Sequence, residues 1–372
     1  MKICGTASLL AALAALAPLP VRAADLTVYF GTHTAGPGKG FSMARFNTET
    51  GALTRPEFIL ETPAPAYYVI APGGRRLYAC NSTGFVSAYS IDASTARLSL
   101  LNQKPSGGGD PSYISLDQTG RYVLVANYDG GNAGVWALAA DGSLGERTAL
   151  VQHTGSGVNP QRQKHAFAHS IRVDPSNRFA LVADLGLDKL FVYKFDASRG
   201  TLQPNDPPFV MSAPGSGARH VIFHPNGRWV YLITEMGSTI MLFNWDTARG
   251  ALTEVETVST LPRDFHGDSA CSEIMVHPSG RFVYASNRGR DSIAVFSVDA
   301  KTGRLTPIQD MPSGGKTPRN FDFDPSAHWM IVTNHGSDNA MVFRIDQQTG
   351  KLAPVGQPVE VPCPFCPRFP AR

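Results

Sequence analysis

The sequence predicts an all-β protein, a seven-bladed β-propeller of four-stranded antiparallel blades whose ring is closed by strands from both termini. Three observations predict it: a turn phrase that recurs along the chain, an incomplete copy at the N-terminus, and a tail able to complete that copy. In each copy, apolar residues lead into Pro-x-Gly-Arg or a close variant, and four or five apolar residues then end on Asn, Asp or Thr. The fourth residue of the phrase recurs every 46 to 57 residues, which is the length of a propeller blade.

The phrase occurs in six copies, each expected to form the hairpin between the first and second strands of a blade. The copies run from Pro72 to Asn81, Gln118 to Asn127, Pro175 to Asp184, Pro225 to Thr234, Pro278 to Asn287 and Pro325 to Asn334. Further along the repeat, alternating apolar residues lead to a Thr-Gly pair, as at Gly51, Gly303 and Gly350. This pattern predicts a third strand and a tight turn into a fourth, with glycine at a positive φ. No stretch after the first 20 residues has convincing helical periodicity.

The two ends of the chain are expected to share one blade. Residues 26–32 match the second half of the phrase but lack the turn and the strand before it. The tail 361–369 stands where a first strand is expected after the sixth copy, so it can supply the missing strand. Closing the ring in this way removes free sheet edges, which otherwise invite aggregation.

The first 23 residues have the outline of a signal peptide. Lys2 gives a short basic region, an Ala- and Leu-rich stretch follows, and Val21-Arg22-Ala23 offers small residues before a cut. Residues 24–372 are therefore expected to form a single propeller domain, exported to the periplasm or secreted. The formal net charge of +3 falls to +1 when Lys2 and Arg22 are removed, so no global field favours nucleic acid or an anionic membrane as a partner. A monomer is expected.

Four cysteines remain after such a cut, at positions 80, 271, 363 and 366. In an oxidising compartment, Cys363 and Cys366 can close a small disulfide near the ring-closing strand, or both can remain as buried thiols. A thioredoxin-like site needs a βαβ setting that the pattern does not predict, and a zinc site needs a second pair of ligands. No cofactor and no metal are expected.

Chemistry is expected where the repeats stop repeating, because residues that the fold requires recur in every blade. Two positions of the repeat are informative: the start of the first strand and the residue just past the second strand. The first position holds Ala66, Ser112, His169, Arg219, Ser272 and Arg319, and the second holds Ser82, Tyr128, Leu185, Glu235, Arg288 and His335. Antiparallel strands joined by a hairpin place the start of one beside the end of the next, so both positions open on one rim of the ring.

Charged residues gather at this rim, on the strands expected nearest the axis. They are His169, Arg219, Glu235, Arg288, Arg319 and His335, and His33 joins them from the N-terminal half-copy. Several arginines around one carboxylate and one imidazole are typical of a site that binds an anion and transfers a proton. The other histidines share no metal-ligand spacing.

Several segments resemble the seven-bladed propeller lactonases, a family that includes the propeller type of 6-phosphogluconolactonase and the fungal carboxymuconate lactonising enzyme. The similar segments are 29–34 (YFGTHT), 126–131 (ANYDGG), 168–175 (AHSIRVDP), 184–188 (DLGLD), 219–227 (RHVIFHPNG) and 286–292 (SNRGRDS). The resemblance covers essentially the whole chain after the signal peptide. It implies a catalytic His, Arg, Glu and Arg, which match His169, Arg219, Glu235 and Arg288.

The resemblance also implies the substrate, a small anionic lactone. His33, Tyr128, Arg319 and His335 are expected to contribute to its binding. Family members often have two histidines separated by one residue, whereas here His165 and His169 are four apart, which leaves open the imidazole that faces the substrate. Export also leaves open whether the lactone carries a phosphate, because sugar phosphates of the pentose phosphate route are cytosolic.

The expected reaction is lactone hydrolysis by direct attack of water, with Glu235 or His169 as general base and Arg219 and Arg288 on the anionic group and the developing oxyanion. No Gly-x-Ser-x-Gly nucleophile motif favours an acyl-enzyme. Two alternatives stay open: a cycloisomerase that interconverts an acidic muconate and its lactone, and an exported propeller that only binds. One Glu amid several Arg at a single rim favours an enzyme.

Overall fold

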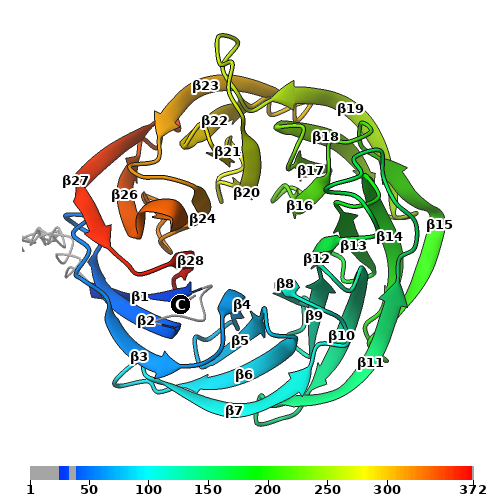
Figure 1. Ribbon diagram of the computed structural model, residues 1–372, viewed down its shortest axis with the longest axis horizontal. Helices are drawn as coiled ribbons and strands as arrows, with labels where there is room; N and C mark the ends of the chain where they lie inside the picture. The colour runs from blue at the N-terminus through cyan, green and yellow to red at the C-terminus, as the bar shows by residue number, and fades with distance from the viewer. Residues whose placement is uncertain (1–24, 33–38, 371–372) are drawn as a thin grey trace, which may run out of the picture.

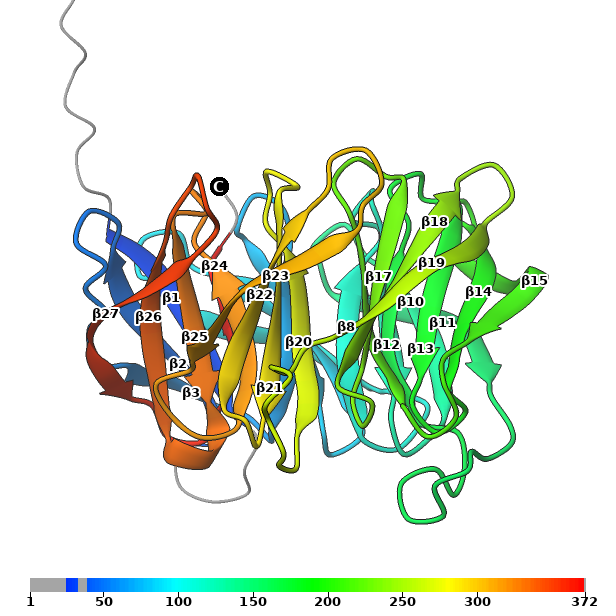
Figure 2. The ribbon, with the colours of Figure 1, turned by 90° about the horizontal axis from the view of Figure 1, so that it is seen from above.

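The computed structural model describes residues 25–32 and 39–370, which form seven four-stranded antiparallel sheets arranged in a ring (Figure 1). The predicted fold class is therefore confirmed. Seen from the side, the ring is a short cylinder with connecting loops on both rims (Figure 2). Within each sheet the strand nearest the axis is followed outward by the next strands of the same repeat, as the hairpin phrase predicts.

Each blade consists of four strands, ordered from the axis outward. The first three blades contain β28 (Pro364–Arg368), β1 (Asp25–Thr32), β2 (Gly40–Asn47) and β3 (Glu57–Glu61); β4 (Pro65–Ile70), β5 (Arg76–Asn81), β6 (Phe85–Ile91) and β7 (Leu98–Pro105); and β8 (Pro111–Leu116), β9 (Tyr122–Asn127), β10 (Asn132–Leu138) and β11 (Leu144–Gln152). The fourth and fifth contain β12 (Ala168–Val173), β13 (Phe179–Asp184), β14 (Lys189–Asp196) and β15 (Thr201–Met211); and β16 (Ala218–Phe223), β17 (Trp229–Thr234), β18 (Thr239–Asp246) and β19 (Ala251–Ser259). The last two contain β20 (Ala270–Val276), β21 (Phe282–Arg288), β22 (Ser292–Val298) and β23 (Leu305–Pro312); and β24 (Pro318–Phe323), β25 (Trp329–Asn334), β26 (Asn339–Ile345) and β27 (Leu352–Glu360), with a 3₁₀ turn η1 (His335–Ser337).

The chain ends close the ring in the predicted way. Strand β28, from the tail, pairs antiparallel with β1, where Gly31 lies opposite Cys366. The sulfur atoms form no bridge: Cys363 is half-buried, Cys366 is buried, and both are free thiols. Of the two states expected for this pair, the disulfide is therefore not the one observed. Backbone pairing, with no covalent link, joins the two ends of the chain.

The recurring turn phrase has a single physical cause, a left-handed backbone at its third residue. In the six copies this residue has φ between +55° and +73°, at Gly74, Gly120, Asn177, Gly227, Gly280 and Ala327. Glycine takes this conformation without a Cβ penalty, which explains why the phrase contains it in four copies. The buried carboxylate of Asp117 caps one such turn by accepting hydrogen bonds from the backbone N–H groups of Arg121 and Tyr122.

Histidine replaces that capping aspartate in two blades. The imidazole Nε2 of His224 lies 2.7 Å from the carbonyl oxygen of Gly280, and Nε2 of His277 lies 2.9 Å from that of Ala327. Each contact joins a turn to the turn of the next blade. These two histidines are therefore part of the inter-blade packing.

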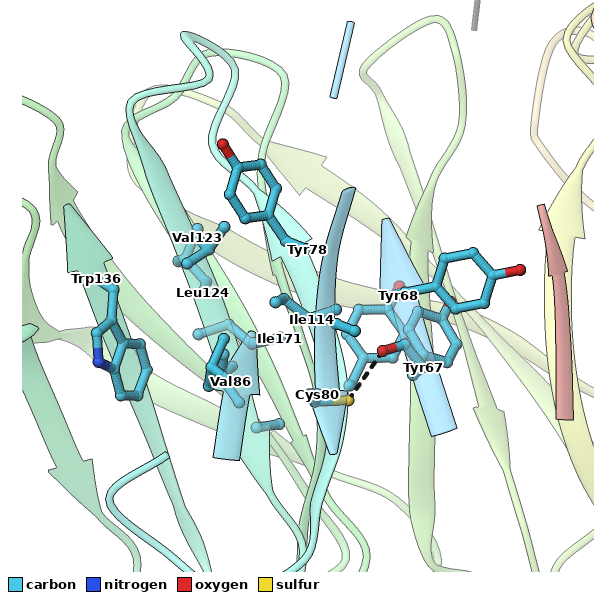
Figure 3. Packing of buried hydrophobic residues seen from close by; sticks show 14 of the residues in the cluster. Tyr67, Tyr68, Tyr78, Cys80, Val86, Ile114, Val123, Leu124, Trp136 and Ile171 are labelled. Atoms are coloured by element: carbon cyan, nitrogen blue, oxygen red, sulfur yellow. Dashed lines mark hydrogen bonds between the residues drawn. The ribbon is translucent and has the colours of Figure 1, made fainter. Parts of the chain in front are cut away.

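Hydrophobic residues fill the space between neighbouring blades. Figure 3 shows one such region, in which Val86 of one blade and Val123 of the next lie among buried aromatic rings. Radial repetition thus buries apolar side chains at each blade junction, and one continuous cluster extends from Tyr29 of the closing blade to Leu202 of the fourth, so a chain of this length needs no second domain. No helix among the described residues has the length and hydropathy of a membrane span.

Candidate active site

A bulge recurs at the start of the innermost strands, and it falls on the rim position that the sequence comparison selected. The ladder between first and second strands shifts register in all seven blades, and one or two residues of the first strand bulge out of the ladder. The bulged residues are Ala66, Ser112, His169, Arg219, Ser272 with Glu273, Arg319 and, in the closing blade, Phe365. Bulges re-aim side chains and are common beside active sites.

Glu235 lies at the centre of the polar cluster at this rim. Its Oε2 accepts a hydrogen bond from Nε of Arg219 at 2.9 Å and lies 3.0 Å from Nη2 of Arg288. The side chains of Glu235 and Arg219 are buried, while Arg288 is partly exposed. Burial alone would raise the pKa of Glu235, but Arg288 and Arg219 hold this pKa well below its ordinary value. Glu235 is therefore an anion that organises guanidinium groups and a weak acceptor of protons.

Arg162 completes this cluster and was not found from the sequence. Its Nη2 donates to Oε1 of Glu235 at 2.6 Å, although 43% of its side chain is exposed. Arg162 lies in the loop between β11 and β12, where the chain passes from one blade to the next. The repeat has no fixed register in such a loop, so comparison of the copies cannot select it.

His169 lies beside the carboxylate, with Nε2 at 3.9 Å from Oε2 of Glu235. Its Nδ1 is buried and has no hydrogen-bond partner among the described residues. Burial lowers the pKa of His169 well below its ordinary value, and the positive charge of Arg219 lowers it further. The ring is therefore neutral at physiological pH and can accept a proton.

The two histidines have different surroundings. His165 stacks on Phe167 at 4.0 Å between ring centroids, and its Nδ1 contacts the carbonyl oxygen of Ala166. His169 instead faces the cluster and meets the edge of the Tyr128 ring at 5.3 Å. Tyr128 thus lies at the predicted rim, next to the imidazole.

Arg319 and His335 both contact the ring of Phe365. The guanidinium carbon of Arg319 is 4.3 Å from the centroid of Phe365, and the His335 ring is 5.6 Å from it. Arg319 forms no ion pair among the described residues, and its Nε is buried without a partner. Burial lowers the pKa of Arg319, and Arg219 and Arg288 lower it further by repulsion. His33, the remaining predicted residue, lies outside the described residues.

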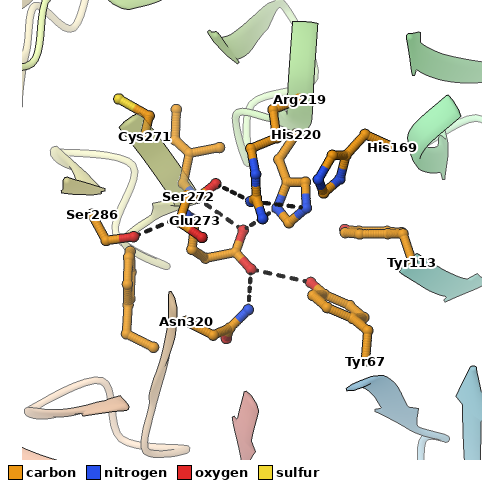
Figure 4. Close-up of polar contacts among 12 residues, drawn as sticks. Tyr67, Tyr113, His169, Arg219, His220, Cys271, Ser272, Glu273, Ser286 and Asn320 are labelled. Carbon is orange, nitrogen blue, oxygen red and sulfur yellow. Dashed lines mark hydrogen bonds and ion pairs between the residues drawn. The ribbon is translucent and has the colours of Figure 1, made fainter. Parts of the chain in front are cut away.

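A second layer of polar side chains lies directly beneath the rim (Figure 4). Nδ1 of His220 is 2.9 Å from Oε1 of Glu273, and Nη1 of Arg219 is 3.2 Å from Nε2 of the same imidazole. Glu273 also accepts hydrogen bonds from Tyr67 and Asn320. Burial would raise the pKa of Glu273, yet His220 contributes most to lowering it to about 2.

These contacts fix the tautomer of His220. Burial lowers the pKa of His220 to about 4, so the ring carries one proton at neutral pH. The ionised Glu273 can only accept, so that proton is on Nδ1, and Nε2 is left to accept from Arg219. Arg219 also donates to the carbonyl oxygen of Ser272. The guanidinium is therefore held between two carboxylate-bearing layers.

Sequence comparison missed this layer, although the layer left a signal in the sequence. The residues that directly follow the six rim positions are Tyr67, Tyr113, Ser170, His220, Glu273 and Asn320. A bulge turns both the rim residue and its successor toward the axis, so two consecutive polar residues at the start of a first strand indicate two layers. The sequence comparison counted a fixed number of residues back from the turn in every copy, so it selected only the rim residue and not the residue that follows it.

The cluster has an excess of positive charge. Arg162, Arg219 and Arg288 lie within ion-pair distance of Glu235, and Arg319 lies near enough to interact electrostatically with Glu235 and with Asp110. Such an arrangement suits a substrate that carries an anionic group, and it places a neutral imidazole beside that group. Within residues 25–32 and 39–370, no group of three or more His, Cys, Asp or Glu side chains is arranged to hold a metal ion.

Comparison with known proteins gives consistent similarities. The family model described as "Lactonase, 7-bladed beta-propeller" matches residues 27–369. The chain is 34% identical over 299 residues to the 6-phosphogluconolactonase of Bacillus subtilis (strain 168), covering 80% of this chain and 84% of that protein. It is 31% identical over 301 residues to the 6-phosphogluconolactonase of Formosa agariphila, covering 77% and 83%. Among solved structures, the periplasmic gluconolactonase of Pseudomonas aeruginosa has a TM-score of 0.88 at 33% identity, covering 94% and 99% of the two chains.

Proposed function

The chain belongs to the seven-bladed β-propeller lactonase family, and from this premise we propose that the cluster around Glu235 hydrolyses an anionic sugar lactone. The observation that carries the proposal is the pairing of a carboxylate held by three arginines with a buried neutral imidazole at 3.9 Å. Lactone hydrolysis needs a proton acceptor for water and positive charge for the oxyanion, and these groups supply both.

His169 is the general base in this proposal. Both oxygens of Glu235 accept from guanidinium donors, so this carboxylate can take a proton only by displacing one of them, whereas His169 has a ring nitrogen without a partner among the described residues. The neutral ring of His169 takes a proton from water as the water oxygen bonds to the lactone carbonyl carbon. When the ring C–O bond breaks, the imidazolium returns that proton to the leaving alkoxide. The product is the open-chain hydroxy acid, so atoms and charge balance.

The arginines divide into two roles. Arg219 and Arg288, fixed on Glu235, stabilise the oxyanion, and loss of one such donor typically reduces the rate by about 10² to 10³. Arg319 has no counter-charge within ion-pair distance among the described residues, so it is the group best placed to receive a phosphate or carboxylate. Binding of that anion cancels positive charge near His169 and raises its basicity at the moment it is needed.

We also propose that the protein is exported. The pattern of residues 1–23, which lie outside the described residues, supports a signal peptide, and a periplasmic gluconolactonase is among the similar structures. Export would favour a lactone without a phosphate, either one whose anionic group is a carboxylate or a neutral aldonolactone that leaves Arg319 without an anion. N-terminal sequencing of the protein recovered from the periplasm or medium should find residue 24; a chain that keeps residues 1–23 and remains in the cytoplasm would contradict export.

The experiment that tests the activity is hydrolysis of glucono-1,5-lactone and its 6-phosphate by the purified chain in a pH-stat, corrected for spontaneous opening. Turnover that is lost in His169→Gln and kept in Arg228→Gln would support the proposal, because Arg228 is an exposed turn residue on the opposite rim. Product analysis should find the hydroxy acid. Equal turnover in the folded His169→Gln protein would overturn the assignment of the base.

A further inference from the structure

A cavity of about 360 Å³ opens at the opposite rim, where the innermost strands end. Its walls come from β4 and β8, and Arg172 of β12, Met275 of β20 and Arg368 of β28 face it across the axis. The stacked rings of Tyr67 and Tyr113, 4.3 Å apart, form its inner end. None of these residues belongs to the rim cluster around Glu235.

Two half-buried arginines face this cavity, Arg172 and Arg368, and the nearby carboxylates interact with them through charge without direct contact: Glu273 with both, and Asp322 with Arg368. Nη2 of Arg172 donates to the hydroxyl of Tyr113 at 2.6 Å, and its Nε is buried with no partner among the described residues. The guanidinium carbon of Arg368 lies 4.9 Å from the centroid of Tyr67, and its Nη1 donates to Oδ1 of Asn320 at 2.8 Å. In the part of the chain that the structure describes, neither arginine has a carboxylate within ion-pair distance.

The nearby carboxylates are engaged with other donors. Asp117 accepts from the backbone of its own turn and from Nδ2 of Asn177. Glu273 accepts from Tyr67 and Asn320 and pairs with His220. Asp322 accepts from the backbone N–H of Phe369, and burial raises its pKa to about 6. The guanidinium groups therefore keep donors that no protein carboxylate takes among the described residues.

A closed layer separates this cavity from the candidate active site. The side chains one step below the rim, among them Ser170, His220 and Cys366, are all at most 5% exposed. Within this layer the carboxylate of Glu273 joins Tyr67, His220 and Asn320 (Figure 4). A molecule at one end of the axis thus cannot reach the other end unless this layer opens.

We propose that the cavity is a second binding site, for a small organic anion whose carboxylate or phosphate is held by Arg172 and Arg368. The two guanidinium groups flank the stacked tyrosines, so the anion binds at the inner end and the body of the ligand lies along the ring faces. A cavity of this volume accommodates a ligand the size of a sugar acid. The proposal is independent of the reaction at the Glu235 cluster.

The two ends of the axis each contain a methionine that can report binding. Met275 lines the cavity, and Met236 contacts the Asn159 side chain in the loop that carries Arg162. Protein labelled with ¹³C at the methionine methyl groups would be titrated with gluconate, with inorganic phosphate and, as a neutral control, with glucose. Met275→Leu and Met236→Leu assign the two signals.

The proposal expects the Met275 signal to move saturably with gluconate or phosphate and not with glucose. Arg172→Gln and Arg368→Gln should each weaken this response about tenfold, the effect of losing one charge-assisted hydrogen bond. Arg121→Gln on the same rim, whose guanidinium bonds the carbonyl of Ala197, should leave it unchanged. Arg288→Gln should also leave it unchanged while reducing any response of Met236.

Three results would overturn the second site. The first is a Met275 signal that does not move with gluconate or phosphate while the Met236 signal does. The second is a Met275 response to glucose as strong as the response to the anions. The third is an affinity for gluconate or phosphate that is unchanged in folded Arg172→Gln and Arg368→Gln proteins. A response to gluconate alone would identify a carboxylate ligand, and a response to phosphate alone would identify a phosphate ligand. Because Met236 and turnover report on the other rim, failure of the second site is distinguishable from failure of the lactonase proposal.

Discussion

Nε2 of His169 lies 3.9 Å from Oε2 of Glu235, and this contact joins an imidazole with a lowered pKa to a carboxylate with a lowered pKa. Their shifts have different causes: burial acts first on His169, whereas the surrounding arginines overcome the effect of burial on Glu235. The pair therefore exists at neutral pH as a neutral ring beside an anion. Because both oxygens of Glu235 accept from guanidinium groups, the ring can take up a proton without displacing any of those hydrogen bonds.

The first prediction concerns the pH dependence of the reaction. The base must be unprotonated, and its pKa in the folded protein is lowered, so activity should be complete above pH 6.5 and be lost only as the pH falls through that lowered pKa. The acid limb of kcat/KM, measured in the pH-stat, should therefore lie below pH 6.5. His169→Gln should reduce kcat/KM by about 10² to 10⁴. An acid limb above about pH 6.5, the ordinary histidine value, in the native enzyme would contradict this role.

The second prediction concerns Glu235→Gln. Removing this charge leaves Arg219 buried without its anionic partner, so the free energy of unfolding should fall by about 3 to 5 kcal/mol. Activity should fall about 10² to 10³-fold because the oxyanion donors lose their fixed positions. Urea unfolding measures the loss of stability, and the lactonase assay measures the loss of activity. The matched control is Glu360→Gln, which removes an exposed ion pair with Arg55 at 2.7 Å and should cost less than about 1 kcal/mol.

Repetition explains how much of this molecule could be predicted from the sequence. The turn phrase determined strand order and ring closure because each copy must satisfy the same left-handed residue and the same hairpin. Departures from the repeat then selected Glu235, Arg219 and their neighbours. The comparison of copies could not select Arg162, because this residue lies in a loop that cannot be aligned between the copies. It also passed over Glu273, because the bulge in β20 holds two residues where a fixed count allows one.

The third prediction is that Glu273 positions Arg219 through His220. In Glu273→Gln the amide can no longer fix the proton of His220 on Nδ1, so Nε2 is no longer a reliable acceptor for Arg219. A small displacement of a catalytic group can reduce the rate by up to about 10²-fold. We therefore expect kcat on glucono-1,5-lactone to fall by about 10- to 100-fold with little change in KM. His220→Gln should have a similar effect on kcat.

If Glu273 had a purely structural role, the expected result would differ. Glu273→Gln would then lower the amount of folded enzyme without changing kcat per folded molecule. Active-site titration or unfolding curves give the folded fraction, and normal kcat in folded Glu273→Gln protein would reject the positioning role. Ser286→Ala is the control, since its hydroxyl accepts from the backbone N–H of Glu273 and its removal leaves the carboxylate in place.

The last prediction separates two contributions at the recurring turn. Gly227 and Gly280 occupy the same position of the phrase with nearly equal φ, +69° and +73°. A Cβ added at Gly227 would meet no atom within 4 Å, whereas at Gly280 it would come within 2.8 Å of the His224 ring. Gly227→Ala should therefore lower stability by about 1 to 2 kcal/mol, through the left-handed backbone alone. Gly280→Ala should lower it further, because the buried ring must shift and its contact with the Gly280 carbonyl weakens.

Urea unfolding of the two variants gives the difference directly, and both should keep native kcat because the turns lie at the rim opposite Glu235. Equal losses of stability in the two proteins would show that the His224 contact between blades adds nothing to the strain of the turn.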